Sequence, residues 1–99
     1  MPELELNEVA GSIVLLRAQD EGTFYGPPDD QIDVDTVFSL DSYDGALGFT
    51  LRNDVNLVAH QAMFNLLRDA FLNNLTVTVD YLIAPGKKNG VAVRVVLTR

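Results

Sequence analysis

The chain has 99 residues, of which 14 are acidic and 7 are basic, so its formal charge at neutral pH is −7. This length fits one domain with one hydrophobic core, and we expect a single domain over residues 1–99. The charge argues against nucleic acid and anionic lipid as partners, and the absence of cysteine excludes disulfides and thiolate metal sites.

The longest apolar run, residues 13–16, is too short to span a bilayer, so no membrane insertion is expected. The first ten residues lack the basic and apolar regions of a signal peptide. A soluble protein follows, cytoplasmic if the chain is full length and secreted if a signal peptide was removed. Residues 1–50 hold eleven acids and one base, whereas residues 51–99 hold three acids and six bases. Such asymmetry suits head-to-tail contact between copies.

Residues 3–18 are expected to form a long first strand. Its apolar positions switch from even to odd numbers between Leu6 and Val9, which is typical of a β-bulge near residues 7–8. The run at residues 13–16 predicts that both faces of the strand are covered there, with another subunit as one candidate cover.

Residues 20–31 contain two glycines, two prolines and four acids, which indicates a loop. A second strand is expected over residues 32–41, because apolar and polar residues alternate there. Its predicted core-facing residues are Ile32, Val34, Phe38 and Leu40. Its predicted solvent-facing residues are Asp33, Asp35, Val37, Ser39 and Asp41.

A turn at residues 43–45 is expected to lead into a third strand, residues 46–52. The only strong helical pattern follows, beginning at Asn53 or Asp54, either of which can cap the helix, and ending at residues 73–74. Its apolar residues cover an arc wider than the roughly 100° stripe that one core uses, so the helix is expected to have two neighbours.

Two more strands are expected at residues 75–84 and 91–99, with Leu75 as the first inward residue and a glycine-containing turn between the strands. The resulting order is β-β-β-α-β-β. Five short strands and one helix in this order predict a mainly β domain, a five-stranded barrel of the oligonucleotide/oligosaccharide-binding (OB) type.

No motif in the sequence indicates a particular enzymatic reaction. The acids Asp29, Asp30, Asp33 and Asp35 lack the spacing and the glycine of a calcium-binding EF-hand loop. The single histidine, His60, excludes two-histidine metal centres, and we interpret it as a hydrogen-bonded interface residue. We therefore expect no enzyme, no cofactor and no metal, with carboxylate catalysis as a third hypothesis.

The outer face of the second and third predicted strands gives a sharper test of nucleic-acid binding. OB barrels that hold single strands use this face, with aromatic rings for stacking and basic side chains for phosphates. Here the face is acidic and has no aromatic residue. Nucleic acid is therefore not an expected partner.

Three aromatic residues lie outside the predicted core. They are Phe24 and Tyr25 in the first loop and Tyr43 in the hairpin turn. Loops of this fold are common ligand sites, and aromatic faces beside Asp and Asn suit a sugar. We take these three residues as the candidate ligand site, with the alternative that Phe24 packs under its own loop.

The second half of the chain resembles the B subunits of AB-type bacterial enterotoxins. The likeness lies in AHQAMFNLLRDAFLNNLTVTVDY, residues 59–81, followed by a glycine-rich turn and VAVRVVLTR, residues 91–99. It implies an OB barrel, a pentameric ring with helices around a pore, and glycan receptors bound on the barrel.

Two functions from different classes follow. The first is a non-enzymatic module that forms a ring-like homo-oligomer and binds a glycan or small polar ligand. The second is a cytoplasmic interaction domain that docks a protein partner on its helix. For the homo-oligomer, the residues expected at the interface are His60, Met63, Phe64, Leu67 and Phe71.

Overall fold

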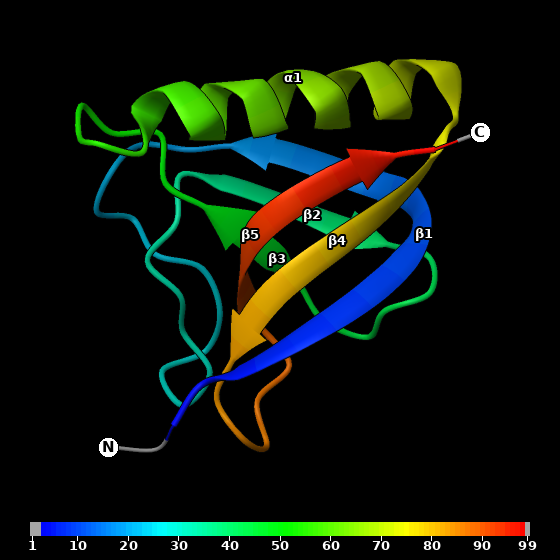
Figure 1. Ribbon diagram of the computed structural model, residues 1–99. Coiled ribbons are helices and arrows are strands. Elements are labelled where there is room, and N and C mark those ends of the chain that lie inside the picture. Colours follow the sequence, from blue (N-terminus) through cyan, green and yellow to red (C-terminus); the bar gives the residue numbers. More distant parts are fainter. Residues whose placement is uncertain (1–2, 99) are drawn as a thin grey trace.

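The computed structural model describes residues 3–98 and contains five strands and one helix (Figure 1). The elements are β1 (Glu5–Ala18), β2 (Thr36–Leu40), β3 (Leu47–Phe49), α1 (Leu57–Asn73), β4 (Thr76–Ile83) and β5 (Gly90–Leu97). The strands form a closed barrel in the order β1-β2-β3-β5-β4, and α1 lies across one end of it. The expected fold class, a mainly β OB-type barrel with one helix, is confirmed.

The first strand is long, as predicted, and it closes the barrel. Its first half pairs with β4, from Glu5 opposite Ile83 to Ser12 opposite Thr76. Its second half pairs with β2. One strand therefore belongs to both halves of the sheet, and Figure 1 shows it curving around the barrel.

The predicted bulge near residues 7–8 is wrong. Pairing between β1 and β4 is continuous through this stretch, and the register shift lies between Ile13 and Leu15 on the β2 side. The switch from even to odd apolar positions has another cause. Leu6 is 64% exposed on the outside of the barrel, whereas Val9 packs against the core, so a regular strand accounts for the pattern.

The predicted cover on both faces of residues 13–16 is also wrong within this chain. Ile13 is buried in the barrel, and Leu16 packs partly against the same core. Val14 is 60% exposed and Leu15 is 37% exposed. The apolar run therefore leaves part of its surface open to solvent.

The barrel interior is one apolar cluster to which every strand and the helix contribute. Phe38 and Phe49 are fully buried at its centre, with their ring centroids 6.4 Å apart in an edge-to-face arrangement. The inward residues of β4 are Val77, Val79, Tyr81 and Ile83, as predicted. Leu75, predicted to be inward, precedes the strand and is 43% exposed.

A second, smaller cluster explains why the predicted outer face of strand two is wrong. The loop between β1 and β2 folds back over this strand, and Tyr25 and Ile32 pack on Val34 and Val37. Val37 is therefore fully buried rather than exposed. Alternation in the sequence separates two faces of a strand, but it does not show that a loop covers the second face.

Strands two and three are shorter than predicted. β2 begins at Thr36 and β3 ends at Phe49. Beyond these ends, the side chains of Asp33 and Asp35 accept hydrogen bonds from Arg52 and from the Leu51 amide. Asp35 was expected in solvent, but it is buried and accepts a hydrogen bond from the Leu51 amide at 2.9 Å. A buried carboxylate of this kind requires such partners.

The helix begins later than predicted, at Leu57, after the N-cap residue Asn56. Asn56 makes no side-chain capping bond, and the carboxylate of Asp54 instead accepts from the Asn56 amide at 2.9 Å. The predicted end is confirmed: Asn74 adopts the left-handed conformation that terminates many helices, with φ of 54°. Among the described residues, no helix has the length and apolar character needed to cross a membrane.

One face of α1 packs on the barrel and buries Met63, Leu67 and Ala70. The assignment of Met63 and Leu67 to an interface with another copy is therefore corrected, because both side chains belong to this chain's own core. The other side of the helix is not covered: Val58 is 81% exposed and Leu72 is 72% exposed.

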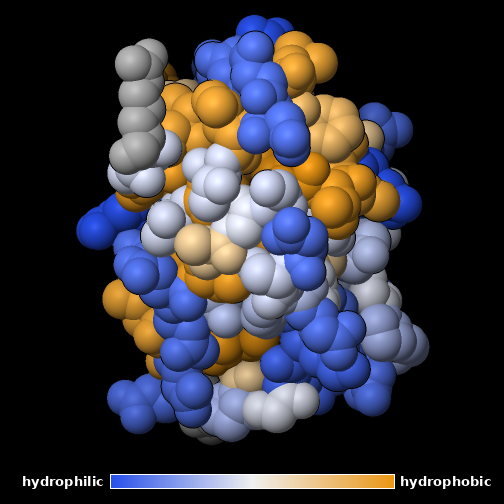
Figure 2. All heavy atoms as spheres, turned by 90° about the vertical axis from the view of Figure 1, so that its right-hand side faces the viewer, coloured by the Kyte–Doolittle hydropathy of each residue, from blue (hydrophilic) through white to orange (hydrophobic). Residues whose placement is uncertain are grey.

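The solvent side of α1 therefore exposes apolar side chains beside polar ones such as Arg68 and Asp69, and the second neighbour expected for the helix stays a prediction. Figure 2 views the molecule from the C-terminal end of α1 and shows apolar side chains gathered in the upper half of this face. The lower half of the same face is largely hydrophilic. Exposed apolar residues at this end include Phe71, Leu72 and Leu75.

The two sides of the helix can be told apart by matched substitutions. We expect Leu67→Ala to lower the free energy of unfolding by about 2–5 kcal/mol, because it leaves a cavity in the closed core. The control Leu72→Ala removes the same atoms from an exposed position and should change it by less than about 0.5 kcal/mol. Urea unfolding of both variants measures this. Equal losses would contradict the packing described for α1.

Candidate functional site

A cavity of about 280 Å³ opens between two loops at the end of the barrel opposite the helix. We call it the notch. Its walls come from residues 28–32 of the β1–β2 loop, residues 82–91 of β4, β5 and the loop between them, and Leu4 just before β1. The two loops lie far apart in sequence, and the closed barrel brings them together.

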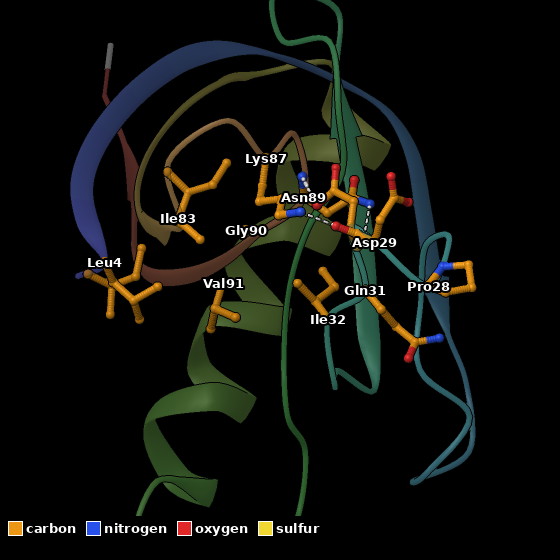
Figure 3. Close-up of a pocket in the computed structure, with 13 residues that line it drawn as sticks. Leu4, Pro28, Asp29, Gln31, Ile32, Ile83, Lys87, Asn89, Gly90 and Val91 are labelled. Atoms are coloured by element: carbon orange, nitrogen blue, oxygen red, sulfur yellow. Dashed lines mark hydrogen bonds between the residues drawn. The ribbon is translucent and has the colours of Figure 1, made fainter. Parts of the chain in front are cut away.

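Most of the notch wall is apolar. The apolar side chains that line it are Leu4, Pro28, Ile32, Leu82, Ile83 and Val91. Figure 3 shows Leu4 and Pro28 at opposite ends of the notch, with Ile83, Val91 and Ile32 between them. Polar residues Asp29, Gln31, Lys87 and Asn89 stand along one side.

Asp30 holds the two loops together. Its carboxylate accepts hydrogen bonds from the backbone amides of Lys88, at 2.8 Å, and Asn89, at 3.2 Å. The side-chain amide of Asn89 donates back to the Asp30 carbonyl at 2.8 Å. A carboxylate that accepts two backbone amides fixes the position of the loop carrying them. We call this set of contacts the Asp30 clamp.

Asn89 extends the clamp into the barrel. Its side-chain oxygen accepts from the Ala46 amide at 3.0 Å, and the neighbouring Gly90 amide donates to the Ala46 carbonyl at 3.0 Å. The parallel pairing of β3 with β5 comprises only two positions, Leu47 with Gly90 and Gly48 with Val91. The contacts of Asn89 therefore lengthen the shortest seam of the barrel.

The β4–β5 loop is also held from the β2–β3 turn. The Tyr43 hydroxyl donates to the Lys88 carbonyl at 2.7 Å, and its ring packs edge-to-face on Tyr81 with centroids 5.2 Å apart. Gly45 has no side chain at the point where a Cβ would collide with the same Lys88 carbonyl. Burial and the nearby Tyr81 raise the pKa of the Tyr43 phenol, which therefore stays protonated and able to donate.

The clamp uses up much of the hydrogen-bonding capacity beside the notch. The carboxylate of Asp30 and both polar atoms of the Asn89 side chain have partners within the chain. The Lys87 ammonium donates to the Asp29 carbonyl. What the notch offers a ligand is mainly apolar wall, with the Asp29 carboxylate and the Gln31 amide at its edge.

A separate ionic cluster fixes the other end of the β1–β2 loop. The Arg52 guanidinium donates to both carboxylate oxygens of Asp33, at 3.0 and 2.5 Å, and its Nε donates to Asp35 at 3.0 Å. This bidentate geometry is the strong form of such a pair. The hydrogen bonds from Arg52 hold the pKa of Asp33 below its ordinary value. The cluster anchors the loop and does not line the notch.

The three aromatic residues predicted as the ligand site do not come together at the notch. Tyr25 packs in the small second cluster, with the Arg17 guanidinium 5.5 Å from its ring centroid. Tyr43 supports the β4–β5 loop from the far side. Phe24 is 45% exposed and has a positive φ of 52°, a backbone conformation that is rare for a bulky side chain.

The remaining residues predicted at an interface are divided between core and surface. The His60 ring lies against Phe49, and its Nδ1 is 2.6 Å from the Thr50 carbonyl oxygen. Because a carbonyl oxygen only accepts, Nδ1 is the nitrogen that carries the proton. Phe64 packs partly on the barrel core, and Phe71 is 44% exposed.

None of the three aromatic residues predicted as the ligand site lines the notch, which lies between the β1–β2 and β4–β5 loops. Its wall combines residues of the predicted loop and turn with residues of the predicted strands. Leu4 and Leu6 offered a sequence signal for an exposed apolar surface. They alternate with polar residues like the rest of the strand, but both side chains lie outside the barrel and are exposed. Within residues 3–98, no group of three or more His, Asp or Glu is placed to hold a metal ion.

Comparison with protein-family models, with curated proteins and with solved structures gives no significant match. Function is therefore inferred from the residues of the notch alone.

The Asp33–Arg52 pair should make stability depend on acid. The folded pKa of Asp33 is lowered, so its contribution to stability is present above the unfolded pKa, near 3.8, and is lost as the pH falls through the folded value. We expect Asp33→Asn to be less stable than wild type at pH 7, with the difference shrinking as the pH falls below 3.8 and through the lowered pKa of Asp33. Urea unfolding across this pH range measures it.

Glu21→Gln serves as the control for that measurement. Glu21 lies 4.0 Å from the same guanidinium but is mostly exposed and is not hydrogen-bonded to it. A difference between wild type and Asp33→Asn that stays constant from pH 7 to pH 2 would contradict the role given to the pair.

Proposed function

We propose that this protein is a non-enzymatic binding module whose ligand site is the notch. The observation that carries the proposal is how the notch is built: an apolar cavity, open to solvent, between two loops that the Asp30 clamp holds in place. Ligand sites are typically preformed concave surfaces with mostly apolar walls and a few polar groups. The walls of the notch are barrel strands and clamped loops, so little conformational entropy of the chain is lost when a ligand binds.

The size of the notch limits the ligand. An apolar protein cavity of about 150 Å³ accommodates benzene. By that measure the notch, at about 280 Å³, takes a group of about ten non-hydrogen atoms. A single large side chain or a small ring compound is of this size.

The lining of the notch favours an apolar group over a sugar. Recognition of hydroxyl groups requires several hydrogen-bonding partners at fixed positions. Here the Asp30 carboxylate and the Asn89 amide already have partners in the chain. In the described part of the chain, no aromatic ring lines the cavity to stack on a sugar face. The glycan suggested by the sequence stays a prediction, attached to Phe24 and Tyr25 rather than to the notch.

Assembly of copies, including the ring implied by the resemblance, also stays a prediction. The exposed apolar side of α1 supports contact with another molecule, since Val58 and Leu72 are mostly uncovered. The uneven charge supports head-to-tail contact less than the sequence suggested. Of the bases in the second half, Arg52, Lys88 and Arg94 already pair with Asp residues of the same chain.

The neutral compound 2-phenylethanol, with nine non-hydrogen atoms, is a suitable probe of the notch. We expect a titration followed by ¹⁵N–¹H NMR to shift the amide signals of Ile32, Leu82 and Val91. Leu4→Ala should weaken binding about fivefold, because the loss of its apolar contact costs about 1 kcal/mol. The control Val14→Ala truncates a similarly exposed residue of β1, 60% exposed against 56% for Leu4, that does not line the notch, and it should leave binding unchanged.

Phe24→Ala separates the notch from the site suggested by the sequence. If the notch is the site, this variant binds the probe like wild type. Loss of binding in Phe24→Ala together with normal binding in Leu4→Ala would overturn the proposal, as would shifts confined to α1.

A further inference from the structure

Acidic residues occur in both chain segments that meet at the notch. Glu3 and Glu5 flank Leu4 in the sequence, and Asp29 and Asp30 belong to the loop across the cavity. Among residues 3–98, Lys87 is the one basic side chain that lines the cavity. Asp29, Asp30 and Lys87 give the cavity wall a formal charge of −1, and Glu3 and Glu5 add two further acids next to Leu4. Lys88, next to Lys87, pairs with Asp44. Low-dielectric walls beside such charges strengthen their attraction for a cation.

The four carboxylates differ in place and in partners, and only those of Asp29 and Asp30 belong to residues that line the cavity. The Asp30 carboxylate is occupied by two backbone amides of the clamp. Lys87 donates to the backbone carbonyl of Asp29, not to its carboxylate. The carboxylates of Glu3, Glu5 and Asp29 form neither a hydrogen bond nor an ion pair with any residue of the described part of the chain.

The apolar surface also continues beyond the cavity. Leu6 on β1 lies opposite Leu82 on β4, and Leu82 lies opposite Val91 on β5. Leu82 and Val91 line the notch, whereas Leu6 is 64% exposed outside it. A row of apolar side chains therefore crosses three strands and leads from the notch onto the outer face of the barrel. A free small molecule would leave this row uncovered.

We infer that the notch recognises a basic segment of a partner protein, with one large apolar side chain in the cavity and neighbouring Lys or Arg residues beside Glu3, Glu5 and Asp29. This inference rests on the proposed function and names its ligand class. The cavity matches one side chain in size, and the exposed row receives the residues next to it. The carboxylate of Asp29 on the cavity wall and those of Glu3 and Glu5 next to Leu4 supply the charge complementarity. The protein's charge of −7 favours encounter with such a partner over an acidic one.

Three compounds that differ mainly in charge test the preference for a cation. They are 2-phenylethylamine, 2-phenylethanol and phenylacetate, titrated into the labelled protein and followed by NMR. We expect the amine to bind about five- to tenfold more tightly than the alcohol at 20 mM salt, and phenylacetate to bind more weakly than both. The advantage of the amine should shrink at 300 mM salt, where exposed charges are screened.

The outcomes separate the inference from the proposed function. Equal binding of the amine and the alcohol at the notch overturns the cation preference and leaves the binding module intact. Absence of binding by all three compounds overturns both. The double variant Glu3→Gln, Glu5→Gln should remove most of the amine's advantage, whereas Asp69→Asn on the distant helix should not.

Capped pentapeptides decide between a protein segment and a free amine. One has a phenylalanine between two lysines on each side, and the matched peptides have serine or glutamate in place of lysine. We expect the lysine peptide to bind more tightly than 2-phenylethylamine by at least tenfold and to shift the amide of Leu6 as well as those of the notch. Binding no tighter than that of the amine, or binding unchanged when serine replaces lysine, would overturn the assignment to a basic protein segment.

Discussion

The contact on which the notch and one barrel seam both depend is the pair of hydrogen bonds from the Lys88 and Asn89 amides to the Asp30 carboxylate. Asn89, once placed, holds Ala46 at the start of β3. This matters because β3 and β5 pair at only two positions, so the barrel is least secured where they meet. The Asp30 carboxylate in the β1–β2 loop thereby supports the pairing of β3 with β5, two strands that lie later in the chain. Local stability of this kind decides which parts of a small domain open first.

The same contacts define the binding surface. The loops that form the notch are tied to each other by Asp30 and to the barrel by Asn89 and Tyr43. The walls between them are strand residues such as Ile83 and Val91. A site built in this way loses little conformational entropy when a ligand enters. It also has few polar groups left to offer, which is why the ligand is argued from shape and charge rather than from a hydrogen-bonding pattern.

The sequence predicted the architecture well and the site poorly, for identifiable reasons. Alternation and turn residues predicted the order of strands and helix along the chain, because each of these signals is local. Whether an apolar residue faces the core is not local: Val37 is buried by a loop, and Leu6 is exposed although both fit the alternation. The Asp30 clamp joins Asp30 to Lys88 and Asn89, which follow it by 58 and 59 positions. No pattern in the sequence links these residues. Tyr43, an aromatic residue in a turn, was predicted to contact a ligand, but its hydroxyl and ring support the β4–β5 loop.

Native-state hydrogen exchange tests the central role of the clamp most directly. The amides to follow are those of Lys88, Asn89 and Ala46, each of which donates to a side-chain oxygen of the clamp. If the clamp secures the loops, all three exchange slowly, with protection close to that of the Gly90 amide at the edge of β5, and Asp30→Ala accelerates their exchange more than that of amides in the β1–β4 ladder. Exchange of these amides at the rate of an unstructured peptide, while the barrel strands stay protected, would contradict the account.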